Sequence, residues 1–348
     1  MCSIPKFMMI QAAVLIKPGE IRLESRAALP PAPGEVEVAV SYVGICGTDL
    51  ALFQGKRQID QPVVPGHEFS GRVHALGGGV TGLQIGKRVS IAPLICCGTC
   101  EFCQSDSGYL CRERRIFGVQ SDGALQERVN VPAKTVFPLS EGISLREGAL
   151  IEPVAVAVHA VRQAGDLRNG RVAIFGAGAI GLLIAQVARA RGAAEVILLD
   201  INNERLNLAR TLGFTGLNNA GVYPSSWFET AGEFDYLFEA SGASTVVEHF
   251  PRMLKPHGVI VIVGRFPLPV PLDLDAILLK EAKLVTSRYF SFLDYQDALQ
   301  LLANQRVCVD SLIQGETLFD RLADGQGSEV MNAACQIVRM LIAFDTDR

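Results

Sequence analysis

Four closely spaced cysteines give the clearest chemical signal in this chain of 348 residues. Cys97, Cys100, Cys103 and Cys111 have the spacing C-x2-C-x2-C-x7-C. Two-residue gaps let thiolates in a tight turn converge on one ion, and a fourth thiolate completes a tetrahedron with no place for water. We therefore predict a structural zinc lobe over residues 96–111. The alternatives are unrelated thiols or an iron–sulfur cluster, but the last gap is long for such a cluster and no proline follows Cys111.

A second signal is a glycine-rich turn with the spacing G-x-G-x-x-G, formed by Gly176, Gly178 and Gly181. It follows a short apolar run and opens an apolar stretch with helical spacing, which is the context that a dinucleotide-binding turn requires. The first glycine permits the tight turn, the second lets the backbone approach a pyrophosphate, and the third allows close packing of helix on strand. With Ala179 and Ile180, these residues are predicted to bind the cofactor at a helix N-terminus.

Asp200 ends the next apolar run, 19 residues beyond Gly181. A carboxylate at this position accepts hydrogen bonds from the adenosine ribose hydroxyls and repels a 2′-phosphate, which favours NAD over NADP. Arg205, on the helix expected to follow, is also predicted to bind the cofactor. The alternative interpretation is a glycine turn that serves packing only, with Asp200 capping the next helix.

Three further segments carry residues that could bind a metal. They are Cys46 in Gly-Ile-Cys-Gly-Thr-Asp, His67 and Glu68 in Gly-His-Glu, and Glu152 in Glu-Pro. Taken singly, each has a simpler explanation: a buried cysteine, a loop histidine, or an acid at the start of a helix. Their spacing alone does not show that they meet in space.

The elements that must position these residues fall into two regions. Up to about Val136, short apolar runs broken by glycine and proline predict a β-rich domain. From Val172 to Val263, apolar strand-like runs alternate with helical stretches, which is typical of a parallel sheet covered by helices. The expected fold class is therefore α/β, with a β-rich domain and a doubly wound parallel-sheet domain.

The composition excludes several classes of function. The chain has 32 Lys+Arg and 36 Asp+Glu, a formal net charge of −4, so no nucleic-acid partner is expected, since phosphate binding needs clustered positive charge. The most apolar stretch, residues 172–188, is too short and too rich in glycine for a membrane span, and no signal-peptide pattern is visible. Nine cysteines without a secretory signal indicate thiols or metal ligands in a reducing compartment. We expect a cytoplasmic protein with no membrane partner.

Taken in order, the motifs resemble the zinc-containing medium-chain dehydrogenases of the alcohol dehydrogenase superfamily. The order is Gly-Ile-Cys-Gly-Thr-Asp, Gly-His-Glu, the four cysteines, Glu-Pro and Gly-Ala-Gly-Ala-Ile-Gly, and the resemblance covers about residues 12–289. Glu152, where other alcohol dehydrogenases have a cysteine, and the pair Arg288-Tyr289 resemble the sorbitol (polyol) dehydrogenase branch.

The resemblance implies a second, catalytic zinc ion. Cys46, His67 and Glu152 would hold it, with Glu68 as an alternate ligand. Mixed ligands with one open position suit a catalytic site. Asp49 would fix the orientation of the His67 ring, as the outer-shell partners of metal-bound histidines commonly do.

The resemblance also implies how the substrate is handled. Thr48 would receive the proton of the substrate hydroxyl, and Arg288 and Tyr289 would line the substrate pocket. The chain departs from its relatives at Ala51, where many have a histidine that completes a proton relay, and at Leu52, where sorbitol dehydrogenases commonly have a tyrosine.

For the whole chain, the resemblance implies a GroES-like catalytic domain formed by residues 1–153 together with 289–348, and a Rossmann domain for NAD over residues 154–288. The implied reaction transfers a hydride from a secondary alcohol, namely a polyol, sugar alcohol or sugar acid, to NAD and gives a ketone. The implied assembly is a homodimer or homotetramer, with the apolar run 259–263 as an edge-forming strand.

Other functions stay open at this point. The Glu-Pro branch also resembles threonine, butanediol and sugar-phosphate dehydrogenases. From a different class, the chain could be a non-catalytic NAD-binding module that kept the fold, since a fold does not guarantee chemistry.

Overall fold

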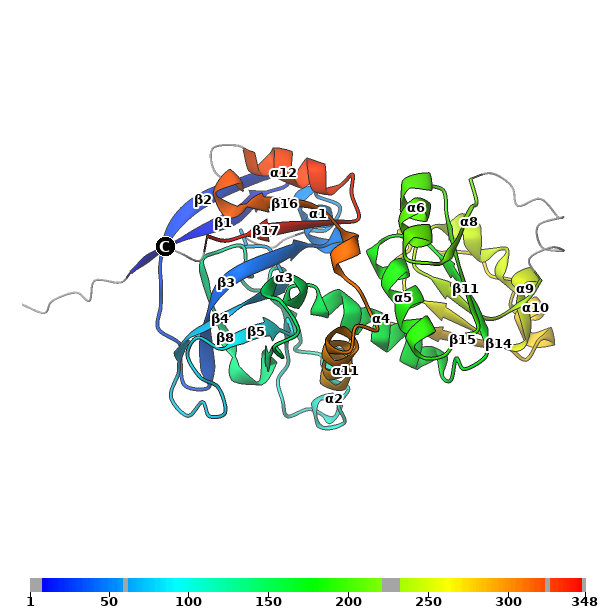
Figure 1. Ribbon diagram of the computed structural model, residues 1–348, viewed down its shortest axis with the longest axis horizontal. Coiled ribbons are helices and arrows are strands. Elements are labelled where there is room, and N and C mark those ends of the chain that lie inside the picture. The colour runs from blue at the N-terminus through cyan, green and yellow to red at the C-terminus, as the bar shows by residue number, and fades with distance from the viewer. Residues whose placement is uncertain (1–7, 59–61, 221–231, 323–325, 346–348) are drawn as a thin grey trace, which may run out of the picture. The chain divides into compact units, whose positions relative to one another are not determined.

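The computed structural model describes residues 8–58, 62–220, 232–322 and 326–345 (Figure 1). The chain divides into two compact units. Unit 1 comprises Met1–Glu152 with Ile313–Arg348, and unit 2 comprises Pro153–Leu312. Both a mixed β-rich unit and a doubly wound unit are present, so the predicted fold class is confirmed.

Unit 1 is built on a sheet whose central strand is β3 (Glu35–Ile45). β3 pairs antiparallel with β4 (Glu68–Leu76), β8 (Arg128–Pro132) and β17 (Arg339–Ala343). The sheet continues through β5 (Arg88–Ile91) and β9 (Val136–Pro138) on one side and β16 (Ile313–Leu318) on the other. Two further antiparallel pairs belong to the unit: β1 (Met9–Lys17) with β2 (Glu20–Ala27), and β6 (Leu94–Ile95) with β7 (Arg115–Ile116). Its helices are α1 (Gly47–Phe53), α2 (Glu101–Gln104), α3 (Leu145–Gly148) and α12 (Gln326–Ala334).

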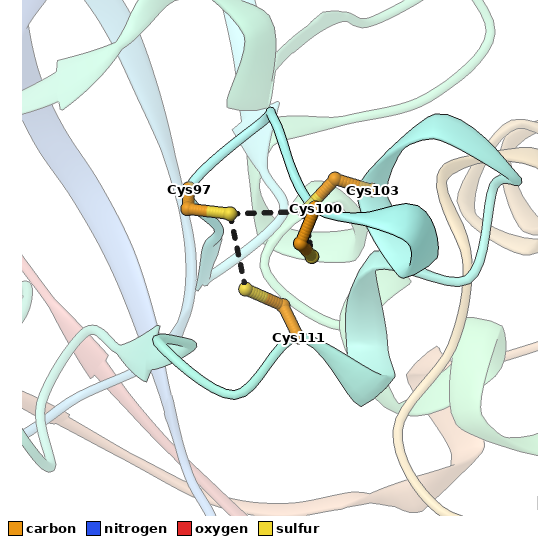
Figure 2. A group of neighbouring side chains, drawn as sticks. All are labelled: Cys97, Cys100, Cys103 and Cys111. Carbon is orange, nitrogen blue, oxygen red and sulfur yellow. Dashed lines mark hydrogen bonds between the residues drawn. The ribbon is translucent and has the colours of Figure 1, made fainter.

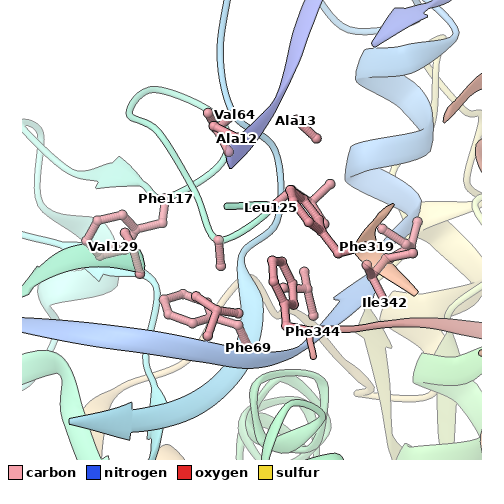
Figure 3. Packing of buried hydrophobic residues seen from close by; sticks show 14 of the residues in the cluster. Ala12, Ala13, Val64, Phe69, Phe117, Leu125, Val129, Phe319, Ile342 and Phe344 are labelled. Atoms are coloured by element: carbon pink, nitrogen blue, oxygen red, sulfur yellow. The ribbon is translucent and has the colours of Figure 1, made fainter. Parts of the chain in front are cut away.

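The core of unit 1 joins residues from both ends of the chain (Figure 3). Phe69 and Phe117 meet edge to face with ring centroids 6.4 Å apart. Phe319 and Phe344 stack at 4.4 Å. Because these aromatic rings bury large apolar areas, the segment from residue 313 onward is a structural part of unit 1.

Unit 2 is a six-stranded parallel sheet in the order β12-β11-β10-β13-β14-β15. Its strands are β10 (Arg171–Phe175), β11 (Glu195–Asp200), β12 (Thr215–Asn218), β13 (Phe234–Glu239), β14 (Leu254–Ile262) and β15 (Lys283–Thr286). Its helices are α4 (Ile151–Ala164, which starts in unit 1), α5 (Ala179–Ala190), α6 (Asn203–Thr211), α8 (Ser244–Val247), α9 (Phe250–Met253), α10 (Leu274–Leu279) and α11 (Phe292–Ala303).

Helices cover both faces of this sheet because each buried strand is apolar on both sides. α5 packs on the face that carries Ile174, which lies close to Gly181. On the opposite face, the ring of Phe250 in α9 lies 5.0 Å from that of Phe175.

Two details differ from the sequence-based expectations. The expected boundary at residue 288 lies at Leu312, because α11 and the segment that follows it belong to unit 2. The expected edge-forming run 259–263 is wrong as an edge: Val259–Ile262 belong to β14, which lies between β13 and β15, so β15 is the edge strand. Among the described residues, no helix is both long and apolar enough to cross a membrane.

Candidate metal centres and cofactor site

The four cysteines of the 96–111 lobe converge (Figure 2). The Sγ atoms of Cys97 and Cys103 are 3.8 Å apart, those of Cys100 and Cys103 3.5 Å, and those of Cys97 and Cys111 3.6 Å. A tetrahedron of sulfur atoms at about 2.3 Å from zinc has edges of about 3.8 Å, so this donor set fits a zinc ion.

Backbone geometry assembles the lobe. Cys100 is the N-cap residue of α2, Cys103 lies inside α2, and Cys111 follows the short 3-10 turn Gly108–Leu110. The N–H groups of Thr99 and Cys100 lower the pKa of Cys97 to about 6. The thiolate is the form that binds a metal, and Cys97 reaches it most easily, whereas burial raises the pKa of the Cys103 thiol to about 12.

A second cluster lies where β3 and β4 meet. The ligand atoms of Cys46, His67 and Glu68 lie within 4.8 Å of one another. Cys46 follows β3 as the N-cap residue of α1, His67 precedes β4, and Glu68 begins it. The antiparallel register pairs Gly44 with Glu68, and this pairing brings the two distant motifs together.

Asp49 ties the two ligand segments to each other. Its Oδ2 accepts a hydrogen bond from Cys46 N at 2.9 Å, and its Oδ1 accepts one from Gly66 N at 3.2 Å. The same Oδ1 lies 3.5 Å from His67 Nδ1. Burial raises the pKa of Asp49, but His67 and the two N–H groups outweigh burial and lower it. The site therefore holds a charged carboxylate directly behind the histidine.

Burial affects the pKa values of both His67 and Glu152. Burial lowers the pKa of His67, but Asp49 and Cys46 outweigh it and raise this pKa well above the ordinary value. Burial, followed by the negative charge of Glu68, raises the pKa of Glu152 to about 8. A thiol, an imidazole and the buried Glu68 carboxylate are ligands that zinc takes, so the cluster of Cys46, His67 and Glu68 fits this metal. The predicted ligand Glu152 lies outside this cluster.

Arg339 is part of this site and was not found from the sequence. Its Nη2 lies 3.0 Å from Glu68 Oε1, and both side chains are nearly inaccessible, at 4% and 0% exposed. Its Nη1 donates to the Ile45 carbonyl at 3.0 Å. The only available signal was an arginine beside the apolar residues of a strand-like run near the C-terminal end.

The glycine turn of unit 2 shows why two of its positions must be glycine. Gly176 has φ +106°, where L side chains are strained. A Cβ at Gly181 would overlap the Gly176 carbonyl oxygen. Gly178 is the N-cap residue of α5 and a Cβ there would meet open space. Ala179 and Ile180 are half-buried in the first turn of α5.

Asp200 stands at the carboxyl end of β11 and faces the turn. Its Oδ2 accepts a hydrogen bond from Ala177 N at 2.7 Å, and its Oδ1 accepts one from Asn202 N at 2.9 Å. Asn202, not Asp200, caps α6, by accepting from the N–H groups of Glu204 and Arg205. The guanidinium Nη1 of Arg205 lies 3.9 Å from Asp200 Oδ2.

The remaining candidates are less constrained. Arg288 Nη2 donates to Tyr289 Oη at 2.9 Å, and its guanidinium lies 4.5 Å from the centre of the Tyr289 ring. Tyr289 has φ +61°, a rare conformation for a bulky residue that folds the two neighbouring side chains together. Thr48 is half-buried in the first turn of α1.

Comparison with known proteins agrees with this architecture. Residues 32–141 match the family described as alcohol dehydrogenase GroES-like domain, and residues 179–304 match zinc-binding dehydrogenase. The chain is 34% identical over 286 residues to a 2-dehydro-3-deoxy-L-galactonate 5-dehydrogenase of Pseudoalteromonas atlantica, covering 80% of this chain and 83% of the relative. It is 31% identical over 348 residues to sorbitol dehydrogenase 2 of Saccharomyces cerevisiae, covering 95% and 97%.

A solved structure is similar over nearly its whole length. A zinc-binding dehydrogenase of Sinorhizobium meliloti, bound to NADP, superposes with a TM-score of 0.87 at 32% identity, over 97% of this chain and 99% of that one.

The fold and the two donor sets define a zinc-dependent dehydrogenase with a GroES-like unit and a Rossmann-like unit. The chain belongs to the zinc-containing alcohol dehydrogenase superfamily, in its polyol dehydrogenase branch. It is an oxidoreductase of secondary alcohols, and its cofactors are zinc and NAD. The roles of its individual site residues remain predictions.

Proposed function

We propose that the protein oxidises one secondary hydroxyl of a polyol or sugar acid to a ketone, with Cys46, His67 and Glu152 as ligands of a catalytic zinc and Glu68 as an alternate ligand. The observation that carries this proposal is the convergence of Cys46, His67 and Glu68 in one buried cluster. The four cysteines from Cys97 to Cys111 would hold the structural zinc.

The chain supplies position and proton handling around this cluster. When bound, zinc supplies a Lewis acid that lowers the pKa of a hydroxyl, and NAD supplies the hydride acceptor. Asp49 holds the Cys46 and Gly66 backbones in place and orients His67. Thr48 would receive the hydroxyl proton and pass its own proton on towards the nicotinamide ribose.

The substrate class follows from the chemistry of Arg288 and Tyr289. A guanidinium already held by a neighbouring phenol is suited to a second hydroxyl or a carboxylate of the substrate. One relative is named for a sugar acid and another for sorbitol, which supports polyols and sugar acids over simple alcohols. The complete set of predicted ligands argues against a non-catalytic module.

The cofactor preference rests on Asp200 and Arg205. The carboxylate at the end of β11 is suited to the ribose hydroxyls of NAD, and a 2′-phosphate would meet its negative charge. The protein is proposed to be cytoplasmic, because every cysteine that the structure describes is free and free thiols and thiolate metal sites are typical of reducing compartments.

The proposed assembly is a homodimer or homotetramer. β15 has a sheet partner on one side only among the described strands, and an open strand edge is a template for pairing with another copy. Leu284 of β15 is exposed, and so are three leucines of the preceding helix α10: Leu274, Leu278 and Leu279.

The test combines activity with cofactor binding. Cys46→Ser and His67→Ala, measured with NAD and a panel of polyols, sugar acids, polyol phosphates, threonine, butanediol and simple alcohols, should lose more than about 1,000-fold in kcat, since zinc provides several kcal/mol to the transition state. NADH affinity should stay near that of the parent. Near-normal kcat in both variants would refute the zinc mechanism, and turnover of threonine alone would redirect the substrate assignment.

A further inference from the structure

Glu239 is the last residue of β13 and lies at the reversal of strand order in unit 2. Open α/β sheets bind dinucleotides outside the carboxyl ends of the strands, at the point where the strand order reverses. Here that point is between β10 and β13, and Phe175 of β10 is in register with Glu239. Glu239 is therefore the direct neighbour of the glycine turn on the side opposite Asp200.

One carboxylate oxygen of Glu239 organises the turn that follows it. Its Oε1 accepts hydrogen bonds from Ser241 N at 2.8 Å, Ser241 Oγ at 2.6 Å and Gly242 N at 2.8 Å. Hydrogen bonds to a charged acceptor are stronger than neutral ones. The conformation of residues 240–242 therefore depends on this side chain.

The 240–242 turn packs directly on the glycine turn. Ala240 N donates to the Phe175 carbonyl at 2.8 Å. A Cβ placed on Gly176 would lie 3.0 Å from the Ala240 carbonyl carbon and from Ser241 N. A displaced 240–242 turn would therefore remove the surface against which Gly176 rests.

Glu239 also contacts the loop that follows β14. Its carbonyl accepts the N–H groups of Val263 and Gly264, each at 2.8 Å. Its Oε2 is buried and has no hydrogen-bond partner within the described part of the chain. A Cβ at Gly264 would overlap Oε2 and lie 2.6 Å from Gly242 N, so only glycine fits beside this carboxylate.

The two acids stand on opposite sides of the glycine turn, because β11 and β13 pair with opposite edges of β10. Asp200 lies on the β11 side, where a carboxylate binds the adenosine ribose. A dinucleotide bound as open α/β sheets bind it would cross the crevice, so its nicotinamide half would extend over the carboxyl ends of β13 and β14. These are the loops that Glu239 holds.

We propose that Glu239 is a positioning residue for the nicotinamide half of NAD, whose side chain acts by holding the 240–242 turn in its binding conformation. It touches neither the reacting atoms nor the adenosine half. Its removal should weaken NADH and leave AMP binding unchanged.

The experiment measures NADH and AMP affinities of the zinc-loaded enzyme by calorimetry. Glu239→Ala should raise the Kd for NADH roughly tenfold or more, because three donors lose a charged acceptor, with the Kd for AMP within about twofold of the parent. Glu239→Gln keeps an acceptor oxygen and should bring NADH binding back to within about threefold. Gly264→Ala, which displaces Oε2 and the Gly242 backbone together, should also weaken NADH with AMP unchanged, and it tests the placement of the 240–242 turn if Glu239→Ala does not fold.

Two control variants separate positioning from general stability. Asp235 lies at the other end of β13, where it accepts from Arg171 N at 2.8 Å and pairs with Lys255 at 2.9 Å. Asp235→Asn should lower Tm without changing either affinity. Asp200→Ala should lack this selectivity and weaken AMP and NADH together. Equal weakening of AMP and NADH in Glu239→Ala, or unchanged NADH binding in Gly264→Ala, would overturn the proposal.

Discussion

The carboxylate of Glu68 is fully buried and depends on Arg339 for its counter-charge. A buried ion pair gains little over an apolar pair, but removing one partner leaves an uncompensated charge and is strongly destabilising. Arg339 also fixes the Ile45 carbonyl, next to the ligand Cys46. The guanidinium thus couples the end of β17 to the predicted zinc ligands.

Arg339→Met should lower the free energy of unfolding by about 3–5 kcal/mol. The double variant Glu68→Gln/Arg339→Met should recover much of this loss, because neither charge of this pair is left without its partner. Urea unfolding followed by circular dichroism measures both. The exposed Arg22, which pairs with Glu20 on the surface, provides the control: Arg22→Met should cost less than about 1 kcal/mol. Equal losses at the two positions would contradict the argument.

The sequence could predict which residues would bind zinc, but not every residue that holds those ligands or the cofactor turn in place. The spacing of the four cysteines encodes their convergence within one turn, so Cys97 to Cys111 could be predicted locally. Asp49 was expected from resemblance. Arg339 and Glu239 lie in strands, and their roles depend on which strand ends meet, which no local pattern contains.

At the scale of elements, α4 and α11 are joined by a buried polar contact. Asp294 Oδ2 lies 2.8 Å from His159 Nδ1 and accepts from Ser291 N at 2.8 Å, and its Oδ1 lies 3.0 Å from Arg162 Nη1. Burial raises the pKa of Asp294, but the bonds from His159 and Ser291 and the charge of Arg162 outweigh it and lower the pKa. This contact explains why α11 belongs to unit 2.

Asp294→Asn should cost about 2 kcal/mol of unfolding free energy at pH 7, because a hydrogen-bonded buried carboxylate is lost. The folded pKa lies below the unfolded one, so this stabilisation is complete above the unfolded pKa and disappears as the pH falls through the folded pKa. Urea unfolding of both proteins from pH 7 to 3 should show a shrinking difference. A difference that stays constant would mean that the charge is irrelevant. Asp297→Asn, at a partly exposed position of α11, should cost less than about 1 kcal/mol.

The lobe between β6 and β7 should depend on its metal. Cys111→Ser is expected to lose one zinc per chain and to lower Tm by roughly 10 °C, because a structural zinc contributes folding free energy directly. Elemental analysis and thermal unfolding measure the two effects. Cys96, whose Sγ faces the Gly108 carbonyl at 3.2 Å, is the matched control, and Cys96→Ser should keep both zinc ions. Loss of zinc from both variants alike would contradict the ligand set.

At the scale of the whole molecule, periodicity predicted the alternating strands and helices of unit 2 but not the residue at which unit 2 ends. The buried Asp294 contact joins two segments that are far apart in sequence, residues 159–162 of α4 and residues 291–294 at the start of α11, so residue 288 was a plausible but early boundary. The edge of the sheet was misplaced for a related reason: β15 is short and mostly exposed, whereas β14 has the stronger apolar run.

The open edge of β15 predicts self-association. Leu279→Glu, at a position 78% exposed on α10, should shift the protein toward a monomer in light scattering, because a charge would be buried in the interface. Leu29, 61% exposed in unit 1, gives the control, and Leu29→Glu should keep the parent mass. An unchanged mass for Leu279→Glu would place the interface elsewhere.

Because β17 belongs to unit 1 but follows unit 2 in the sequence, unit 1 can be completed only after unit 2 has been synthesised. Ile45 and Arg339 are 294 residues apart, and ribosomes add about 5–20 residues per second. Roughly 15–60 s therefore pass between the emergence of β3 and that of its partner β17, and all of unit 2 is made in this interval. Unit 2, which would bind the nucleotide, can fold before Arg339 of the metal site has been synthesised. A nascent chain would thus acquire the ability to bind its cofactor before it could hold its catalytic metal in a finished pocket.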